Sequence, residues 1–494
     1  MSKNRLIVFI FFFFFLLGLM IRVYKINQQP FSDWDEGIYA QVAKEIIKNK
    51  SLETTFNNKI WLNKPPLSHL LIALVFSFTN YSQFYSRLIF VVFSFFTFLY
   101  TYKVAWKIFP QSSIPLLAPL FLLASEVYLE RSTTLNTDII IAFSWIGYIY
   151  YINSFWKKIF FLLLGVWSKS LVGFYPLFFE LIYFFYKKNY LRKEKIMKLV
   201  VYLNFAVLLA SLWYLWAYLK FGNYFLEAHF YDQILKRVEK PIELHFGENL
   251  GIKYYPLKLF EKAQLLTIFL FIGYFSLLMK LFKLINKEGT KAFFTKNFLP
   301  FLYFLFPLPF LIFLLFGKSK IYWYLIFPLP FLALTATFPF YQLKKTLRKI
   351  AFFLVFIMLI FSFVEKTYLY KASTEKSERH ELALCLKKSP FKKVAHLVDV
   401  NERNNYQFIK NNQLNTKTSF IYGGSPAFFY YADKDIDFFY NVSEFKKKYF
   451  NYPIVILKEE DRVNEQINVN NYNIICQTKN PLHHERWYGF KKKD

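Results

Sequence analysis

Cysteine, glycine and acidic residues are scarce in this sequence of 494 residues. With 2 Cys, 14 Gly and a hydrophobic fraction of 55%, the chain is not a disulfide-rich, collagen-like or disordered protein. Only 33 Asp and Glu stand against 62 Lys and Arg, so the formal net charge is +29. Internal repeats, a nucleotide-binding glycine loop and metal-ligand spacing are also missing from the sequence.

Long apolar runs decide the class of protein. Aromatic residues make up 23% of the chain, and the apolar residues come in blocks of roughly 15 to 25, the length that crosses a bilayer. The first block carries no small-x-small cleavage site after it, so we interpret it as a retained anchor rather than a signal peptide. The expected spans are 6–20, 84–108, 112–130, 139–156, 159–168, 170–186, 197–219, 263–282, 298–316, 321–340 and 350–364.

The placement of basic residues predicts the orientation of these spans. A further apolar block, 66–78, is short for a span and follows a Pro-Pro pair. If it lies along the membrane interface, there are eleven spans, and the basic connections all fall on the side of the N-terminus, which is then cytoplasmic. Those connections lie around 103–107, 157–158, 187–198, 280–296 and 344–349. Most of the net charge therefore marks topology, and no nucleic-acid partner is expected.

This topology predicts a multi-pass α-helical membrane domain and a small soluble domain. The membrane domain covers 1–365, with two long outer loops at 25–83 and 220–262, and the C-terminal α/β domain covers 366–494 outside the membrane. Strand-like runs in this tail lie at 394–400, 436–440, 454–458 and 472–476. Cys385 and Cys476 both fall in the tail, where a disulfide and two free thiols remain open alternatives.

Two unusual polar motifs lie in the first outer loop. In the first, Asp35 and Glu36 precede a helical stretch. They are either a solvated helix cap or, in the case of Asp35, a general base at the water–lipid boundary. In the second, Lys64 stands just before Pro65 and Pro66. It is either a snorkelling anchor or a cation that the rigid bend directs at a phosphate.

Three more charged motifs fall at outer ends of predicted spans. Asp138, preceded by Arg131, starts one span, where it is either a simple cap or a second site carboxylate. Lys169 lies between two spans, and intramembrane lysines are costly, so an anionic partner or ligand is expected. Lys318 and Lys320 break the positive-inside pattern and suggest an anionic ligand, whereas the aromatic residues beside them are typical of interface anchors.

These motifs all fall on one side of the membrane and pair carboxylates with cations next to lipid. Such a set favours chemistry on a membrane-embedded phosphate. Because the inner loops carry no ATP site, the energy must arrive in the substrate itself. A lipid-phosphate sugar meets this condition, since its phosphate leaves when the sugar is transferred.

At this point the sequence resembles a known group, the GT-C glycosyltransferases. The bacterial branch that it resembles includes lipid A aminoarabinose transferases and is related to protein O-mannosyltransferases. The resemblance covers about residues 1–365, and it reaches the tail only through 424–430. It rests on Asp35-Glu36-x-x-Tyr39-Ala40, Lys64-Pro65-Pro66-Leu67, Arg131 with Asp138, Ser168-Lys169 with Gly173, and Ser319-Lys320-x-x-x-Tyr324 with Pro330.

The resemblance implies an inverting transfer from a polyprenyl-phosphate sugar on the outer face of the bacterial inner membrane. The acceptor would be lipid A, another envelope glycan or a protein. Asp35 would be the base and Asp138 the second acidic residue, Lys64 and Lys169 would bind the lipid phosphate, and Lys320 with Tyr324 would line the donor cavity. The substrate-binding residues are then Glu36, Tyr39, Lys64, Arg131, Lys169, Arg237, His245, Lys318, Lys320 and Tyr324.

The remaining expectations concern cofactors, partners and competing functions. Aminoarabinose transferases usually carry Glu where Asn63 stands, and that residue can help hold zinc, so no metal or other cofactor is expected here. The expected partners are the donor, the acceptor and membrane lipids, with the chain as a monomer. A transporter or flippase for lipid-linked sugars and a non-catalytic assembly protein are the alternatives, although paired repeats typical of transporters are missing from the sequence.

Overall fold

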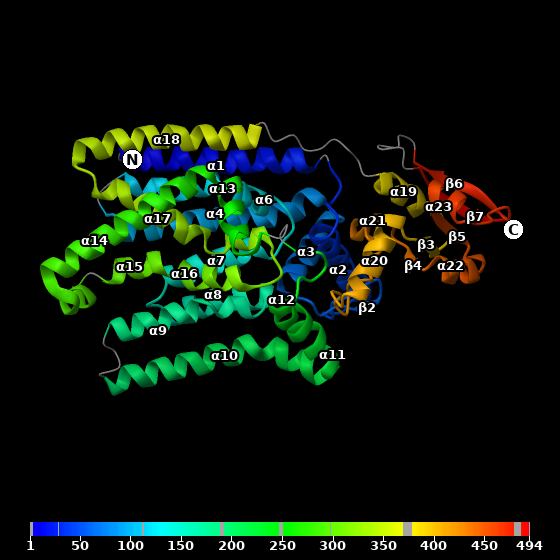
Figure 1. The fold of residues 1–494 in the computed structure, drawn as a ribbon, viewed down its shortest axis with the longest axis horizontal. Coiled ribbons are helices and arrows are strands. Elements are labelled where there is room, and N and C mark those ends of the chain that lie inside the picture. The colour runs from blue at the N-terminus through cyan, green and yellow to red at the C-terminus, as the bar shows by residue number, and fades with distance from the viewer. Residues whose placement is uncertain are drawn as a thin grey trace. The chain divides into compact units, whose positions relative to one another are not determined.

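Helices dominate the computed structural model of this chain (Figure 1). The structure describes residues 3–27, 29–110, 113–187, 192–246, 250–296, 298–368, 378–478 and 486–493. One basic residue of the predicted inner connections, Lys188, lies outside the described residues, and so does the stretch 369–377 near the predicted start of the soluble tail.

The chain divides into two compact units. The helical unit comprises Met1–Tyr24, Arg87–Asn223 and Phe246–Tyr370, and the mixed unit comprises Lys25–Ser86, Tyr224–His245 and Lys371–Asp494. The first predicted outer loop and the tail therefore belong to one unit, whereas the second predicted outer loop is divided between the two.

Every predicted span coincides with a helix or a broken pair of helices. Among the described residues, four helices are long and apolar enough to cross a membrane, namely α4, α10, α14 and α18. Apart from α1, the helices at the other predicted spans are shorter, so the number of eleven spans stays a prediction. The elements of this part are α1 (Lys3–Asn27), α4 (Gln83–Ile108), η1 (Ile114–Leu116), α5 (Leu117–Leu123), α6 (Glu126–Thr133), α7 (Asp138–Tyr150), α8 (Phe155–Lys169), η2 (Leu171–Phe174), α9 (Pro176–Tyr186), α10 (Lys193–Phe221), α11 (Asn223–Phe225), η6 (Gly251–Lys253), α13 (Tyr254–Lys262), α14 (Gln264–Lys296), α15 (Phe298–Leu305), α16 (Pro307–Phe316), η7 (Tyr322–Ile326), α17 (Leu329–Gln342) and α18 (Lys345–Tyr368).

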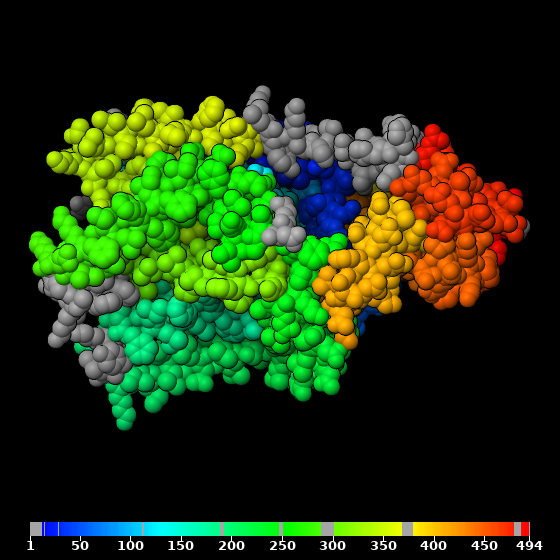
Figure 2. Space-filling model, in the orientation of Figure 1, coloured from blue at the N-terminus to red at the C-terminus, as the bar shows by residue number. Residues whose placement is uncertain are grey.

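Packing in the helical unit combines an apolar exterior with paired charges inside. Between their charged ends, most outward side chains of α10 and α18 are apolar, as expected of helices that contact lipid, and α18 forms the yellow edge in Figure 2. Between α8 and α9, buried Lys158 donates to Glu180 at 2.6 Å, and Tyr148 of α7 donates to the same carboxylate at 2.9 Å. The buried Lys158 ammonium and the Glu180 carboxylate thus pair with each other, because a charge without a partner is costly in an apolar interior.

The mixed unit contains both helices and strands. Helix α3 has a buried face that includes His69 and Phe76, while Leu74 and Phe78 are 56% and 82% exposed. A two-faced helix of this length agrees with the interfacial position predicted for 66–78, which stays a prediction. The elements are α2 (Asp35–Asn49), β1 (Thr55–Phe56), β2 (Lys59–Ile60), α3 (Leu67–Thr79), the π-helix η4 (Leu226–Leu235), α12 (Lys236–Glu239), α19 (Glu378–Lys387), β3 (Lys393–Leu397), α20 (Val400–Asn411), α21 (Pro426–Ala432), β4 (Asp435–Phe439), α22 (Val442–Lys448), η8 (Tyr449–Asn451), β5 (Ile454–Lys458), α23 (Glu459–Asn464), β6 (Tyr472–Gln477) and β7 (Trp487–Lys492).

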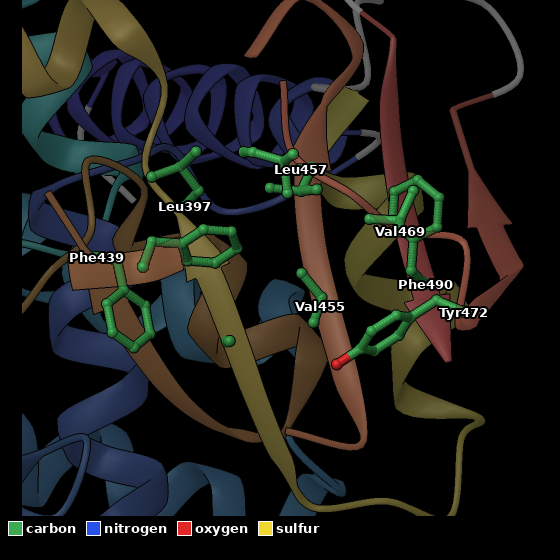
Figure 3. Close-up of a cluster of buried hydrophobic side chains, with 10 residues drawn as sticks. Leu397, Phe439, Val455, Leu457, Val469, Tyr472 and Phe490 are labelled. Atoms are coloured by element: carbon green, nitrogen blue, oxygen red, sulfur yellow. The ribbon is translucent and has the colours of Figure 1, made fainter. Parts of the chain in front are cut away.

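A five-stranded sheet organises the tail. Its strand order is β4-β3-β5-β7-β6, with β3 parallel to both β4 and β5 and with β7 antiparallel to β5 and β6. Each of the four stretches expected as strands contains a strand, although β3 ends at Leu397 and α20 already begins at Val400, and β7 was not predicted. One face buries a cluster that includes Leu397, Phe439, Val455 and Phe490 (Figure 3). Cys385 of α19 and Cys476 of β6 form a disulfide, which settles the alternative left open by the sequence.

One buried histidine gives the sheet an acid-sensitive point. His396 of β3 is packed among the rings of Phe428, Phe438 and Trp487, and neither ring nitrogen has a hydrogen-bond partner in the described part of the chain. Burial, assisted by the positive charge of Arg379, lowers the pKa of His396 from 6.5 to about 3. The folded state therefore holds the ring neutral.

His396→Phe is expected to stabilise the mixed unit by about 1 kcal/mol or more at neutral pH, because it removes an unsatisfied polar ring. The folded pKa lies below the unfolded one, so the stability of the wild-type chain is lost as the pH falls from 6.5 towards 3. The free energy of unfolding of the variant should fall less over the same pH range. Thermal unfolding of the full chain in detergent between pH 7 and pH 4 measures both effects, and two parallel curves would contradict this explanation.

Candidate functional site

In the helical unit, a buried carboxylate sits at the beginning of α7. Asp138 is 1% exposed, and its backbone N–H donates to the Oδ1 atom of Asn136 at 2.9 Å, so Asn136 caps the helix. The carboxylate accepts a hydrogen bond from Lys169 Nζ, and Arg131 Nη1 lies 3.7 Å from its Oδ2 atom. Three residues that the sequence singled out therefore form one buried ion cluster.

Lys169 owes its position to a close approach between two backbone segments. It is the last residue of α8, after which Ser170 has a φ of 81° and the short helix η2 folds back. Gly173 of η2 lies so close to α8 that a Cβ atom there would stand 2.2 Å from Val166 N. Only glycine permits this contact, and the contact sets the end of α8 beside the cluster.

Aromatic residues of η7 complete the surroundings of the cluster. The Lys169 Nζ atom lies 4.6 Å from the ring centroid of Tyr324, and the Arg131 guanidinium lies 4.3 Å from that of Trp323. Tyr322 donates to Glu130 at 2.9 Å, and Glu130 lies 3.6 Å from Arg131. The two cations are thus held by carboxylates on one side and by ring faces on the other.

Two further lysines predicted as ligands are placed differently. Lys320 donates to the carbonyl oxygens of Leu314 and Leu315 at 3.1 and 2.8 Å. Its ammonium group therefore caps the C-terminal end of α16, a favourable position for a cation. Lys318 is exposed in the turn before it.

In the mixed unit, the Asp35-Glu36 motif forms the first turn of α2. Asp35 is the first helical residue, and it follows Trp34, whose φ of 68° is unusual for a residue with a side chain. Glu36 is 2% exposed and accepts hydrogen bonds from Ser32 N and Oγ at 3.0 and 3.1 Å. The Glu36 carboxylate therefore binds the turn that precedes α2. Tyr39 is also buried, edge-on to His69.

The turn that precedes α2 also contacts the tail segment 424–430. The Asp33 carboxylate accepts from Ser425 Oγ at 2.9 Å and from Ala427 N at 3.1 Å. Burial raises the pKa of Asp33, opposed by these hydrogen bonds and by Arg379. A Cβ atom on Gly37 would lie 2.5 Å from Ala427 N, so the glycine allows the tail to approach α2. The part of the resemblance that reached the tail therefore corresponds to a structural contact with the Asp35 turn.

Two cations from distant parts of the sequence meet in the mixed unit. Gln233 Oε1 accepts from Lys64 Nζ at 3.4 Å and from Arg237 Nη2 at 3.2 Å. Gln233 lies in the π-helix η4, a rare conformation often found at functional positions. Glu243 stands 3.6 Å from Arg237. The two cations thus contact one neutral amide, and Arg237 also has a carboxylate nearby.

His245 connects this group to Asp35. Burial lowers the pKa of His245, and the Arg237 charge lowers it further, whereas Glu243 and Asp35 act in the opposite direction. The imidazole is therefore neutral near pH 7. Because Asp35 and Arg237 both act electrostatically on His245, the structure brings Asp35, Lys64, Arg237 and His245 into one group within this unit.

Sequence inspection missed the residues that orient these charges. Gln233 and Glu243 carry no motif of their own, and their only signal is their spacing of four before and six after Arg237. The expected absence of a metal stays a prediction. Asn63 donates its amide to Thr418 Oγ1 at 2.6 Å, and the described residues include no group of three or more His, Cys, Asp or Glu placed to hold an ion.

Comparisons with known proteins establish the fold. No family model matches the chain. An uncharacterized protein of Aquifex aeolicus (strain VF5) is 26% identical over 216 residues, which is 41% of this chain and 42% of that protein, so the match spans less than half of either. ArnT from Cupriavidus metallidurans bound to undecaprenyl phosphate is similar with a TM-score of 0.71 at 10% identity, over 99% of this chain and 98% of that chain. The chain has the fold of ArnT.

Two further solved structures are similar in fold. The apo state of the same ArnT has a TM-score of 0.66 at 10% identity, over 99% of this chain and 98% of that chain. The archaeal oligosaccharyltransferase AglB from Archaeoglobus fulgidus, in complex with an inhibitory peptide and a dolichol-phosphate, has a TM-score of 0.51 at 11% identity, over 91% of this chain and 70% of that chain. The resemblance that the sequence motifs suggested is thus confirmed at the level of the fold.

A double-mutant cycle tests the ion cluster of the helical unit. Asp138→Asn or Lys169→Met alone leaves a buried charge short of a partner, whereas the double variant removes both charges. We expect a coupling free energy of about 1–3 kcal/mol between the two positions, measured by unfolding in mixed detergent and denaturant. Additive effects would mean that the two side chains are not paired in the folded protein.

Proposed function

We propose that this chain is a glycosyltransferase that moves a sugar from a polyprenyl-phosphate donor to an acceptor at the outer face of the bacterial inner membrane. The acceptor would be lipid A, another envelope glycan or a protein, and the transfer would invert the anomeric centre. The fold supports this proposal, because the similar ArnT structure holds undecaprenyl phosphate and the similar AglB structure holds a dolichol-phosphate and a peptide.

The observation that carries the proposal is the pair of cations on Gln233. Lys64 and Arg237 come from segments that are far apart in the sequence, and the folded chain directs both at one amide oxygen. Like charges held side by side repel, so such an arrangement favours a ligand that carries negative charge on several oxygens. A phosphate monoester or diester has this property, and the guanidinium of Arg237 matches its geometry.

In the proposed reaction, an acceptor hydroxyl oxygen attacks the anomeric carbon while the bond from that carbon to the phosphate oxygen breaks. Negative charge develops on the leaving phosphate, where Lys64 and Arg237 would stabilise it. In the helical unit, Lys169 stays a predicted ligand of a lipid phosphate, with Asp138 as the residue that orients its ammonium. Tyr324 would line the donor cavity beside Lys169.

The proton of the acceptor hydroxyl would pass to the Asp35 carboxylate. A carboxylate suits this role because the hydroxyl becomes acidic only as its bond to the sugar forms. Neutral His245 adds no positive charge beside Asp35, so it does not weaken the carboxylate as a proton acceptor. His245 would accept a hydrogen bond from the acceptor sugar or lipid, or donate one to it.

The disulfide supports the proposed orientation. Bonds such as Cys385–Cys476 persist in oxidising compartments, and the tail that carries it would lie in the periplasm. This agrees with eleven spans that begin in the cytoplasm. No cofactor has a role in the proposed reaction, and the chain would act as a monomer in contact with membrane lipids.

Asp35→Asn is expected to lower transfer by about a hundredfold or more, because the amide cannot accept the proton. The readout is the mass-spectrometric profile of envelope glycans and lipids from cells that lack the chain, cells that carry it, and cells that carry the variant. A signal that depends on the wild-type chain should disappear in Asp35→Asn. A profile restored fully by the variant would exclude Asp35 as the base.

Glu444→Gln provides the matched control. Glu444 is an exposed carboxylate of α22 whose partner is Lys448 in the next helical turn, and such a pair contributes little to stability. It should restore the complete profile. If deletion of the chain changes no sugar-containing species at all, an envelope glycosyltransferase is the wrong assignment. Accumulation of an unmodified lipid-linked sugar in the deletion strain and in Asp35→Asn agrees with a role in sugar transfer. If the Asp35→Asn variant still transports the lipid-linked sugar across the membrane, a flippase is favoured.

A further inference from the structure

A basic hollow lies in the mixed unit, apart from the residues assigned to sugar transfer. It has a volume of about 670 Å³, and its walls come from α2, the end of α3, the start of α4, α19, α21 and the segments before β3 and β4. Its charged lining residues are four lysines and two aspartates, which leave a net charge of +2. They are Lys44, Lys48, Lys387, Lys392, Asp433 and Asp435.

The two aspartates are already engaged, so they do not neutralise the lysines as a group. Asp433 pairs with Lys44 at 2.8 Å, and Asp435 accepts from the amide of Asn58 at 3.2 Å. Within the described parts of the chain, Lys48, Lys387 and Lys392 have no carboxylate at ion-pair distance.

The lysines also act on one another. Burial lowers the pKa of Lys44, and the nearby charges of Lys387 and Lys48 lower it further against the opposing effect of Asp433. Cations from α2 and α19, which are more than three hundred residues apart, are therefore close enough to repel. An anion bound among them would relieve this repulsion.

One wall of the hollow is continuous with a candidate membrane-spanning helix. Asn80 and Tyr81 line it directly after α3, and Gln83, which also lines it, is the first residue of α4. Because α4 is long and apolar enough to cross a bilayer, its first residue marks the level of the lipid headgroups. The exposed side chains of Leu74 and Phe78 on α3 precede this wall and are suited to contact acyl chains.

Aromatic rings complete the lining. Tyr81, Tyr430 and Tyr431 all face the hollow, and Tyr430 also accepts a hydrogen bond from Lys44 on its carbonyl oxygen at 3.0 Å. Tyrosine is enriched where protein meets headgroups, since its ring is apolar and its hydroxyl is polar. Lysines with tyrosines at this level are typical of surfaces that bind anionic lipids.

We propose that this hollow binds the phosphate-bearing headgroup of an anionic membrane lipid. Lys48, Lys387 and Lys392 would contact the phosphate oxygens, while Leu74 and Phe78 would lie against the acyl chains. The proposal concerns a site other than that of the sugar donor, because none of the residues assigned to transfer lines the hollow. It therefore holds or fails independently of the proposed function.

Binding of short-chain lipids to the full chain in detergent tests the proposal. The probes are dioctanoyl phosphatidic acid, dioctanoyl phosphatidylcholine and inorganic phosphate, titrated against the wild-type chain and against the double variant Lys387→Gln/Lys392→Gln. We expect the wild-type chain to bind the phosphatidic acid about tenfold more tightly than either other probe. The double variant should lose about tenfold in affinity for the phosphatidic acid alone.

The control is the double variant Lys446→Gln/Lys447→Gln, which removes the same charge from exposed positions of α22. It should bind as the wild-type chain does. Equal loss in both double variants would show that net charge rather than the hollow attracts the lipid, and would overturn the proposal. Equally tight binding of inorganic phosphate would assign the hollow to a free anion instead of a lipid, and the absence of any phosphatidic acid binding would exclude the site altogether.

Discussion

A charged side chain that is buried away from water needs an oppositely charged partner or hydrogen bonds from the protein. Both groups of candidate site residues, the one around Asp138 and the one around Gln233, meet this condition. Asp138 is buried between Lys169 and Arg131, and the cations in turn lie against aromatic rings. In the mixed unit, Gln233 orients Lys64 and Arg237 without cancelling their charge. The chain thus builds positive charge into fixed positions before any ligand arrives, which reduces the reorganisation that binding an anion would require.

Local sequence patterns were sufficient for much of the fold. Apolar blocks predicted the helices, since the length and composition of a segment that crosses a bilayer are set by the lipid itself. Short apolar runs separated by polar stretches predicted four of the five strands of the tail sheet, and the strands β3 and β5 are buried over almost their whole length. The short block at 66–78 differs in length from the spans, and α3 indeed carries one buried and one exposed face. The likeness in fold to ArnT agrees with the resemblance that motifs such as Asp35-Glu36 and Lys64-Pro65-Pro66 suggested.

Contacts between distant segments could not be predicted in the same way. Nothing near Lys64 indicates that Gln233 will contact it, because that contact depends on a π-helix 169 residues away. The role of Asp33 as the acceptor for the tail segment and the use of Lys320 as a helix cap are likewise consequences of tertiary packing. Charge type alone identified candidates for a site, whereas the partners that orient each charge required the structure.

The central claim is that Lys64 and Arg237 hold the phosphate of a polyprenyl-phosphate, and direct binding tests it most closely. Undecaprenyl phosphate can be titrated against the purified full chain, the variant Lys64→Gln/Arg237→Gln and the control Lys446→Gln/Lys447→Gln. Loss of two charge-assisted contacts should weaken binding by about tenfold or more in the first variant and leave the control unchanged. Equal affinity in all three proteins would contradict the assignment of these two cations to the phosphate.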